Sequence, residues 1–96
     1  MQGMTLKQFM KTIVTYDEIE FSYEDVQYDL QKENASDGKV MISIWQSGEP
    51  PRCCYSIEIS EDMTAKVAKD IIQAKILHDG MSIASVENKI CVEFFT

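Results

Sequence analysis

The N-terminal part of the chain has the hydrophobic pattern of an amphipathic helix. Apolar side chains recur at helical spacing on one face, at Leu6, Phe9, Met10 and Ile13. Thr5 and Gln8 have the spacing of a capping box, in which side chain and backbone exchange hydrogen bonds where a helix begins. The pattern breaks at Thr15. It therefore predicts a short helix between Thr5 and Thr15 that packs on an apolar surface.

Four segments of alternating hydrophobicity follow, as is typical of strands. Their apolar rows are Ile19, Phe21 and Tyr23, then Val26, Tyr28 and Leu30, then Val40, Ile42 and Ile44, and finally Cys53, Tyr55, Ile57 and Ile59. Most alternate positions are polar, so we expect an antiparallel sheet that is covered on one face only. Asp37-Gly38 predicts a turn between the second and third strands. The third strand also carries Met41 and Trp45 on its other face, which favours a central place in the sheet.

The C-terminal part predicts a second helix and two more strands. The helix is expected from about Ser60, a favoured N-cap residue, to His78, with Gly80 ending it. Alternating runs at Met81–Ser85 and Ile90–Phe94 predict the strands. The element order is α-β-β-β-β-α-β-β. It predicts one α+β domain over residues 1–96, a two-layer sandwich of a mostly antiparallel sheet of about five to six strands with two helices on one face.

The predicted second helix carries two apolar stripes. One stripe, expected to cover the sheet, contains Met63, Val67, Ile71, Ala74 and Leu77. The other, on nearly the opposite side, contains Ala65, Ala68, Ile72 and Ile76. Three interpretations are open: the first helix or a loop of the same chain covers the second stripe, a partner or second copy does, or lysine stems shield it. The second interpretation predicts a homodimer formed through this helix.

The charge of the chain is strongly acidic. Its 96 residues, 45% of them hydrophobic, carry a formal net charge of −7. This balance argues against direct binding to nucleic acid or to anionic membranes, which both require a basic surface. Acidic residues without an intervening base occur between Tyr16 and Gln31, at Asp17, Glu18, Glu20, Glu24, Asp25 and Asp29. They predict a negative region of the surface, which in one interpretation imitates nucleic-acid phosphates for a basic partner.

The chain has features of a cytoplasmic protein. Its apolar runs are too short for a transmembrane helix, and Met1–Met4 has neither the basic nor the apolar stretch of a secretory signal. The count of 3 cysteines is odd, which fits a reducing compartment better than a set of disulfides. We therefore expect a soluble protein in the cytoplasm.

The residues that carry chemistry form no recognisable motif. His78 with Cys53, Cys54 and Cys91 would supply enough ligands for zinc, but adjacent strand residues point to opposite faces, so Cys53 and Cys54 are not expected to share an ion. The glycines form no phosphate-binding loop. We therefore predict no catalytic residue, no cofactor and no metal.

The sequence favours a non-enzymatic protein-binding or regulatory module, with itself or another protein as partner. Two alternatives are open. One is the acidic decoy, an inhibitor of a nucleic-acid-binding protein. The other is a small enzyme or ligand carrier with a pocket between the layers, which would contain Cys53, Cys91 or His78.

Overall fold

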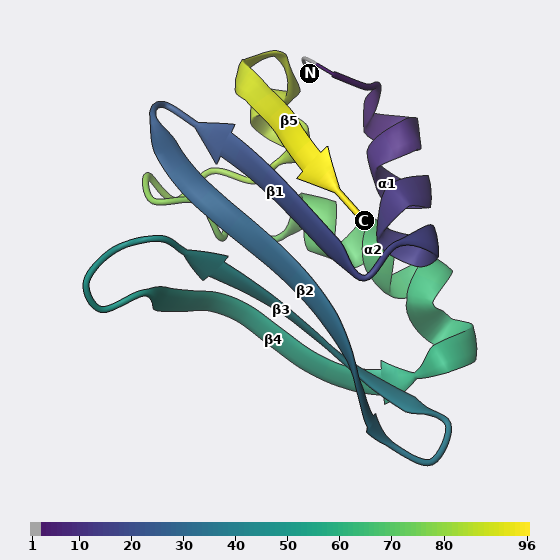
Figure 1. The fold of residues 1–96 in the computed structure, drawn as a ribbon. Helices are drawn as coiled ribbons and strands as arrows, with labels where there is room; N and C mark the ends of the chain where they lie inside the picture. Colours follow the sequence, from purple (N-terminus) through teal and green to yellow (C-terminus); the bar gives the residue numbers. More distant parts are fainter. Residues whose placement is uncertain (1–2) are drawn as a thin grey trace.

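The computed structural model describes residues 3–96; Met1 and Gln2 of the N-terminal segment considered above lie outside the described residues. It confirms the α+β fold, with a five-stranded sheet in the order β4-β3-β2-β1-β5 in which all neighbours are antiparallel. The strands are β1 (Glu18–Tyr23), β2 (Val26–Ser36), β3 (Lys39–Gln46), β4 (Arg52–Ser60) and β5 (Ile90–Phe95). The helices α1 (Leu6–Thr15) and α2 (Thr64–Gln73) lie on one face of the sheet (Figure 1).

The face of the sheet under the helices is mainly apolar, and its centre is buried. Its completely inaccessible side chains include Ile19, Phe21, Tyr28, Leu30, Ile42 and Ile44. The Phe21 ring stacks on Tyr28 at a centroid distance of 5.2 Å and meets the Phe9 ring of α1 edge-on at 5.7 Å. Because these alternate residues all face one way, the period-two pattern of the sequence places the core between sheet and helices.

Both ends of α1 are capped as their chemistry predicts. The Gln8 backbone N–H donates to Thr5 Oγ1 at 3.1 Å and the Thr5 N–H donates to Gln8 Oε1 at 2.7 Å, which confirms the capping box. At the other end, Lys32 Nζ of β2 donates to the carbonyls of Ile13 at 3.0 Å and Val14 at 2.7 Å. A cation there matches the negative end of the helix dipole.

The second helix is shorter than the sequence predicts. It ends at Gln73 rather than His78, because Ala74 adopts an extended conformation with ψ of 140°. Ile76 and Leu77 then turn into the core, and the His78 N–H donates to Tyr28 Oη at 2.8 Å. Burial of the two side chains and of this hydroxyl outweighs the helical preference of the local sequence. Gly80, with φ of 82°, closes a turn through its N–H to the Leu77 carbonyl instead of ending the helix.

The predicted exposure of the second stripe is wrong. Ala68 is 0% exposed, Ile72 is 4% exposed and Ile76 is 8% exposed, all within one chain. Because α1 packs against α2, the chain itself encloses Ala68 and Ile72, and Ile76 lies beyond the helix end. Of the four residues proposed as an interaction surface, Ala65 alone is exposed. The first of the three interpretations holds, and the stripe gives no reason for a homodimer.

The strand predicted over Met81–Ser85 is also wrong. The chain there forms a loop that leads into η2, a 3₁₀ helix over Ala84–Lys89; a shorter one, η1, spans Glu61–Met63. Ser82 and Ser85 exchange side-chain and backbone hydrogen bonds of 2.9 to 3.2 Å, which stabilises a turn instead of an extended strand. Among residues 3–96, no helix has the length and apolar character that crossing a membrane requires.

Candidate functional site

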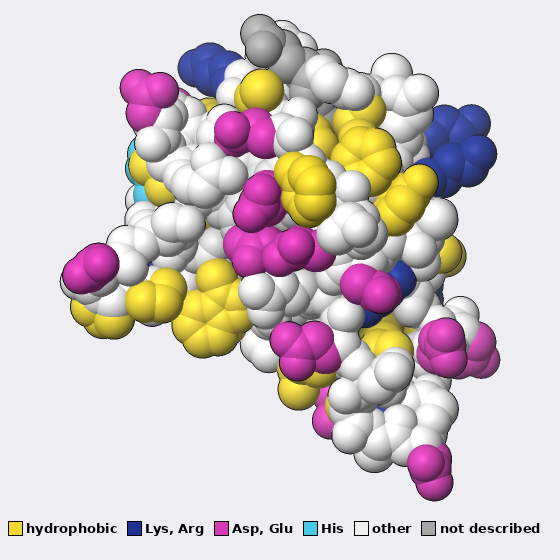
Figure 2. All heavy atoms as spheres, viewed as in Figure 1, with side chains coloured by type: hydrophobic (Ala, Val, Ile, Leu, Met, Phe, Trp, Pro, Cys, Tyr) yellow, Lys and Arg dark blue, Asp and Glu magenta, His cyan; other side chains and the backbone are white. Residues whose placement is uncertain are grey.

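The face of the sheet opposite the helices is not covered by another layer of the described chain. Figure 2 shows this open face, where acidic side chains gather near the centre between two groups of hydrophobic side chains. It carries the residues that alternate with the buried rows, including Glu18, Glu20, Asp29, Glu33, Met41, Ser43 and Trp45. Trp45 is 36% exposed and Phe94 is 48% exposed. Large aromatic rings beside carboxylates on an accessible face are features of binding surfaces.

Strand pairing brings one residue from every strand into a line across this face. Asp29 of β2 is paired with Glu20 of β1 on one side and with Trp45 of β3 on the other. Glu20 is paired in turn with Phe94, and Trp45 with Cys53. We call these five residues the transverse row. Directly paired residues have their Cβ atoms about 4.5–5.5 Å apart, so neighbouring side chains in the row are within reach of one another.

Two β-bulges produce the ends of the transverse row. In β4 the pairing passes from Tyr55 to Cys53, which leaves Cys54 as the extra residue. In β5 it passes from Val92 to Phe94, which leaves Glu93 as the extra residue. A bulge shifts the alternation of the strand by one residue. Cys53, which was predicted to share a row with Tyr55, and Phe94, which was predicted to alternate with Ile90 and Val92, therefore lie on the open face.

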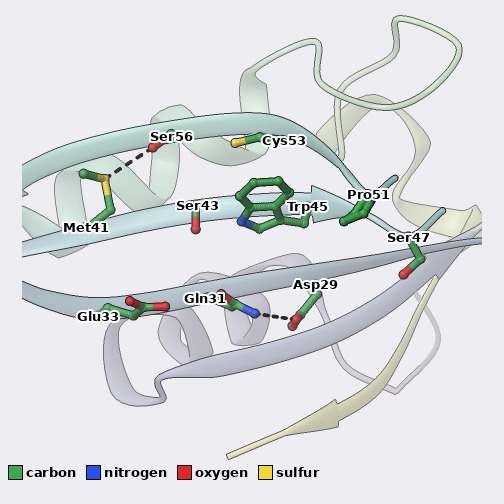
Figure 3. Close-up of a pocket in the computed structure, with 10 residues that line it drawn as sticks. All are labelled: Asp29, Gln31, Glu33, Met41, Ser43, Trp45, Ser47, Pro51, Cys53 and Ser56. Carbon is green, nitrogen blue, oxygen red and sulfur yellow. Dashed lines mark hydrogen bonds between the residues drawn. The ribbon is translucent and has the colours of Figure 1, made fainter. Parts of the chain in front are cut away.

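A groove of about 560 Å³ runs over the open face of β2, β3 and β4. Its lining residues are Asp29, Gln31, Glu33, Met41, Ser43, Trp45, Ser47, Pro51, Cys53 and Ser56, which Figure 3 draws. Trp45 lies near the middle of the groove, between Ser43 and Pro51 (Figure 3). Along one wall Ser56 Oγ donates to Met41 Sδ at 3.3 Å. The groove therefore combines an apolar floor with a carboxylate wall.

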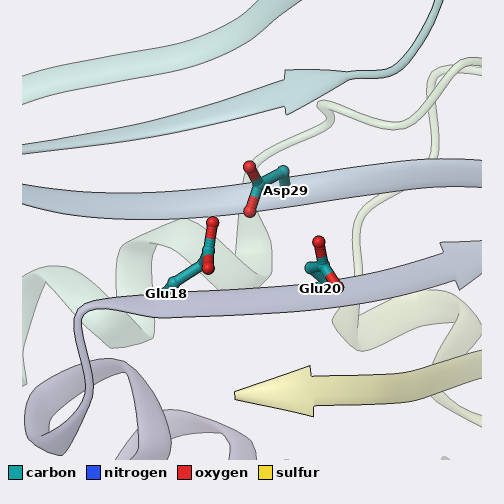
Figure 4. Close-up of side chains that lie close together, drawn as sticks. All are labelled: Glu18, Glu20 and Asp29. Carbon is teal, nitrogen blue, oxygen red and sulfur yellow. The ribbon is translucent and has the colours of Figure 1, made fainter. Parts of the chain in front are cut away.

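Three carboxylates meet where β1 and β2 pair. Glu18, Glu20 and Asp29 each bring an oxygen within 4.8 Å of the others, and Figure 4 shows the side chains close together. Asp29 Oδ2 accepts a hydrogen bond of 2.8 Å from Gln31 Nε2. Its other oxygen, Oδ1, is shielded from solvent and has no hydrogen-bond partner among the described residues. We call these three residues the acidic cluster.

The other charges of the acidic cluster disfavour ionisation of Glu18. The pKa of Glu18 is raised above 4.5, first by the charge of Asp29, then by burial, by the charge of Glu20 and by a side-chain hydrogen bond with Asp29. A bound cation would relieve this repulsion. Oxygen ligands of this kind suit a divalent cation such as Ca²⁺ and also a guanidinium or ammonium group.

The structure brings together only part of the predicted negative region. Glu18, Glu20 and Asp29 form the acidic cluster, whereas Glu24 and Asp25 occupy the tight turn between β1 and β2, both with positive φ. Asp17 lies before β1 and lines a different hollow, beside Lys32. The six acids therefore form separate groups, because the turn and the strand alternation send them in different directions.

The residues considered for catalysis or zinc binding lie apart. Cys53 is on β4 and Cys91 is on β5, at opposite edges of the sheet. Cys53 lines the groove while Cys54 packs against the core, so the two do lie on opposite faces in spite of the bulge. His78 Nε2 lies 3.2 Å from Glu24 Oε1, beside the turn. Among residues 3–96, His78 and the three cysteines form no group of three ligand atoms close enough to hold one ion.

A second polar group, next to this turn, has a structural explanation. Tyr23 Oη donates to Asp79 Oδ2 at 2.7 Å. This hydrogen bond, with burial and the Asp79 charge, raises the pKa of Tyr23 to about 12. The same bond holds the pKa of Asp79 below 3.8, although burial opposes it. The pair joins the end of β1 to the segment between α2 and β5, and so fixes that long connection.

The groove was not predicted from the sequence, although two residues of β3 signal it. Met41 and Trp45 were recognised as apolar residues on the second face of the third strand and interpreted as a sign of a central position. In the structure they line the groove, and β3 lies second from the edge of the sheet. Comparisons with protein-family models, curated protein sequences and solved structures found no match to this chain.

Proposed function

We propose that the protein is a non-enzymatic protein-binding module whose partner docks on the open face of the sheet. The observation that supports it is the groove, which lies on a sheet face without a covering layer and contains the exposed Trp45 ring. Tryptophan in an accessible hollow is a frequent centre of protein interfaces. This proposal keeps the binding role predicted from the sequence and moves it from the second helix to the sheet.

The two alternatives have less support. An acidic decoy would use the six acids as one surface, but these residues are divided among the acidic cluster, the turn and the hollow near Lys32. A ligand carrier would use a pocket between the layers, where the described side chains form a continuous apolar core. The open face offers both a hollow and accessible aromatic area, so a docking role explains more of its features.

Photocrosslinking tests this proposal in the cell. A diazirine-bearing residue of similar size replaces Met41, which lines the groove, and in a matched control it replaces Met63, an exposed methionine outside the groove. We expect one distinct protein to crosslink from position 41 and not from position 63. A partner captured equally from both positions, or from position 63 alone, would contradict docking on the open face.

We further propose a cytoplasmic location. Its support is that all 3 cysteines are free, with Cys53 exposed and Cys54 and Cys91 half-buried. Unpaired thiols of this kind are stable in a reducing compartment. Cell fractionation followed by thiol alkylation tests this: the protein should be in the cytosolic fraction with all its thiols reactive after unfolding without reductant, and disulfide-linked protein would contradict it.

A further inference from the structure

We propose that the groove accepts an arginine-bearing, extended segment of the partner, with the guanidinium placed between Trp45 and the acidic cluster. This inference rests on the proposed function, since it names the chemistry of the partner that docks on the open face. It is carried by the transverse row, in which Asp29 is paired with Trp45 on one side and Glu20 on the other. The carboxylates of Asp29 and Glu20 and the indole ring of Trp45 therefore lie side by side on the open face.

The charge of the open face is uncompensated near the transverse row. The basic side chains of β2 and β4 have other partners: Lys32 caps α1 from the covered side, and Arg52 donates to Gln46 Oε1 at 2.9 Å. Lys39 lies at the far end of β3, 3.9 Å from Glu58. The carboxylates of the acidic cluster thus have no cationic partner within the described chain. A cation on the incoming molecule would supply the missing charge.

Arginine fits the groove better than lysine. A guanidinium is planar, stacks on an aromatic ring and donates two parallel hydrogen bonds to a carboxylate, whereas an ammonium is a compact and strongly hydrated charge. Trp45 presents such a ring, and the cluster presents several carboxylate oxygens beside it. The apolar lining from Met41 and Pro51 can take the methylene stem of the side chain.

Other occupants of the groove fit less well. A second copy of this chain would bring two acidic clusters together in a protein of net charge −7, which electrostatic repulsion opposes. A divalent cation would satisfy the carboxylates but leave the Trp45 ring and the apolar lining without a role. The experiment below separates these occupants.

Peptide titration tests the inference directly, because Trp45 is the only tryptophan of the chain and reports on the groove by its fluorescence. The probes are Ac-Gly-Arg-Gly-Arg-Gly-NH₂, the same peptide with lysine, and the same peptide with citrulline, which is the neutral counterpart of arginine. Binding is followed by Trp45 emission and by amide shifts in ¹H–¹⁵N spectra. We expect roughly millimolar affinity for so short a probe, at least about threefold tighter for arginine than for lysine, and none for citrulline.

Charge variants locate the site. Asp29→Asn keeps the shape of the side chain and should weaken arginine-peptide binding by about tenfold, since it removes one charge beside the ring. Asp62→Asn removes the same charge from the exposed η1 and should leave binding unchanged. The dispersion of the ¹H–¹⁵N spectrum confirms that both variants are folded. Raising the salt concentration should weaken binding of the arginine peptide in wild type.

Several outcomes would overturn the inference. These are equal binding of the three peptides, no loss on Asp29→Asn, equal loss on Asp62→Asn, or a response of the groove to CaCl₂ alone with none to the arginine peptide. Dimerisation at high concentration with shifts confined to the open face would also overturn it. The proposed function can stand when the inference fails. A crosslinked partner that docks on the open face through a segment without arginine would support the binding role and contradict the arginine inference.

Discussion

The two faces of the sheet are built from the same strands and have opposite properties. On the covered face Ile19, Phe21 and Tyr28 are completely buried beneath the helices. On the open face their direct neighbours in sequence, Glu20 and Asp29 among them, form a charged cluster beside a half-exposed tryptophan. Consecutive residues of one strand thus belong to different environments, because successive side chains point to opposite sides.

The two faces also differ in what they contribute to the stability of the fold. The covered face stabilises the fold because its apolar area is removed from water, which contributes about 25 cal/mol per Å² to the free energy of folding. The open face contains features that oppose stability, such as three adjacent carboxylates and an Asp29 oxygen without a hydrogen-bond partner. Such costs are compatible with the binding role proposed for this face.

The strongest test compares neighbours on β1. Phe21→Ala should lower the free energy of unfolding by about 3–5 kcal/mol, because it leaves a cavity where the ring stacks on Tyr28 and meets Phe9. Ser22→Ala, on the open face of the same strand, should change it by less than about 0.5 kcal/mol. Urea denaturation followed by circular dichroism measures both. Similar losses in the two variants would show that the faces do not differ in this way.

Tyr23→Phe, at the edge of the covered face, tests the contrast through the pH dependence of stability. Its effect should be smaller than that of removing the Phe21 ring. Because the pKa of Tyr23 is raised to about 12, its hydrogen bond to Asp79 adds stability below pH 10 that is lost as the pH rises toward 12. Because the pKa of Asp79 is below 3.8, the same bond adds stability above that pH, which is lost on further acidification. The variant should be less stable at neutral pH, with a shallower decline between pH 10 and 12.

Absorbance of tyrosinate at about 295 nm, together with denaturation at several pH values, measures this effect. Tyr16→Phe serves as the control, because Tyr16 is exposed and lies outside the contact with Asp79. Loss of the same alkaline slope in the control, or its persistence in Tyr23→Phe, would contradict the role given to Tyr23.

Substitutions in the turns between strands provide a reference, because they alter neither the covered face nor the open face. Asp25 has a φ of 64°, a region in which glycine is free of the steric cost of a Cβ. Asp25→Gly should therefore raise the free energy of unfolding, by up to about 1 kcal/mol. Gly38→Ala, at the next hairpin with φ of 69° and an open surrounding, should lower it by a similar amount. Thermal denaturation measures both, and shifts of equal sign would refute the backbone explanation.

The smallest expected effect on stability lies in the acidic cluster. Glu18 has its pKa raised above 4.5 by Asp29, so its ionisation lowers the stability of the fold once the pH is above that raised value. Asp29→Asn should bring the pKa of Glu18 down and make the protein slightly more stable at neutral pH. The gain should shrink as the pH falls below 4.5, where Glu18 becomes protonated in both the folded and the unfolded protein.

Carboxyl ¹³C shifts recorded by NMR during a pH titration measure the pKa of Glu18 in wild type and variant. Asp62→Asn is again the matched control, since Asp62 lies on η1 and not on the open face. An unchanged pKa of Glu18 in Asp29→Asn would mean that Asp29 is not its main perturbing charge, and the acidic cluster would then lose its electrostatic basis.

Much of the fold could be predicted from the sequence, because its strongest signals are local. The capping box of Thr5 and Gln8 and the turn at Asp37-Gly38 depend only on neighbouring residues, and both are present. The apolar rows of β1, β2 and β3 could also be predicted, since alternation follows from the pleat of a strand. The end of α2 could not, since Ile76 and Leu77 leave the helix for a core that other segments form.

The candidate site was predicted only in fragments. Glu18, Glu20 and Asp29 were recognised as acidic, but so were Asp17 and Glu24, which the fold sends elsewhere. The second stripe of the helix was mistaken for a surface because a helical pattern shows which side chains share a side, and not what covers them. In the structure α1 packs against α2, and Ala68 and Ile72 of that stripe are buried within the chain.

By itself the sequence determined which residues alternate, where the first helix begins and that the surface is acidic. Only the tertiary structure decided which strand is paired with which, and therefore that Asp29 lies between Glu20 and Trp45. It also decided the bulges at Cys54 and Glu93, which bring Cys53 and Phe94 to the open face. Alternation is a property of a few consecutive residues, whereas pairing, register and bulges depend on contacts between segments far apart in the chain.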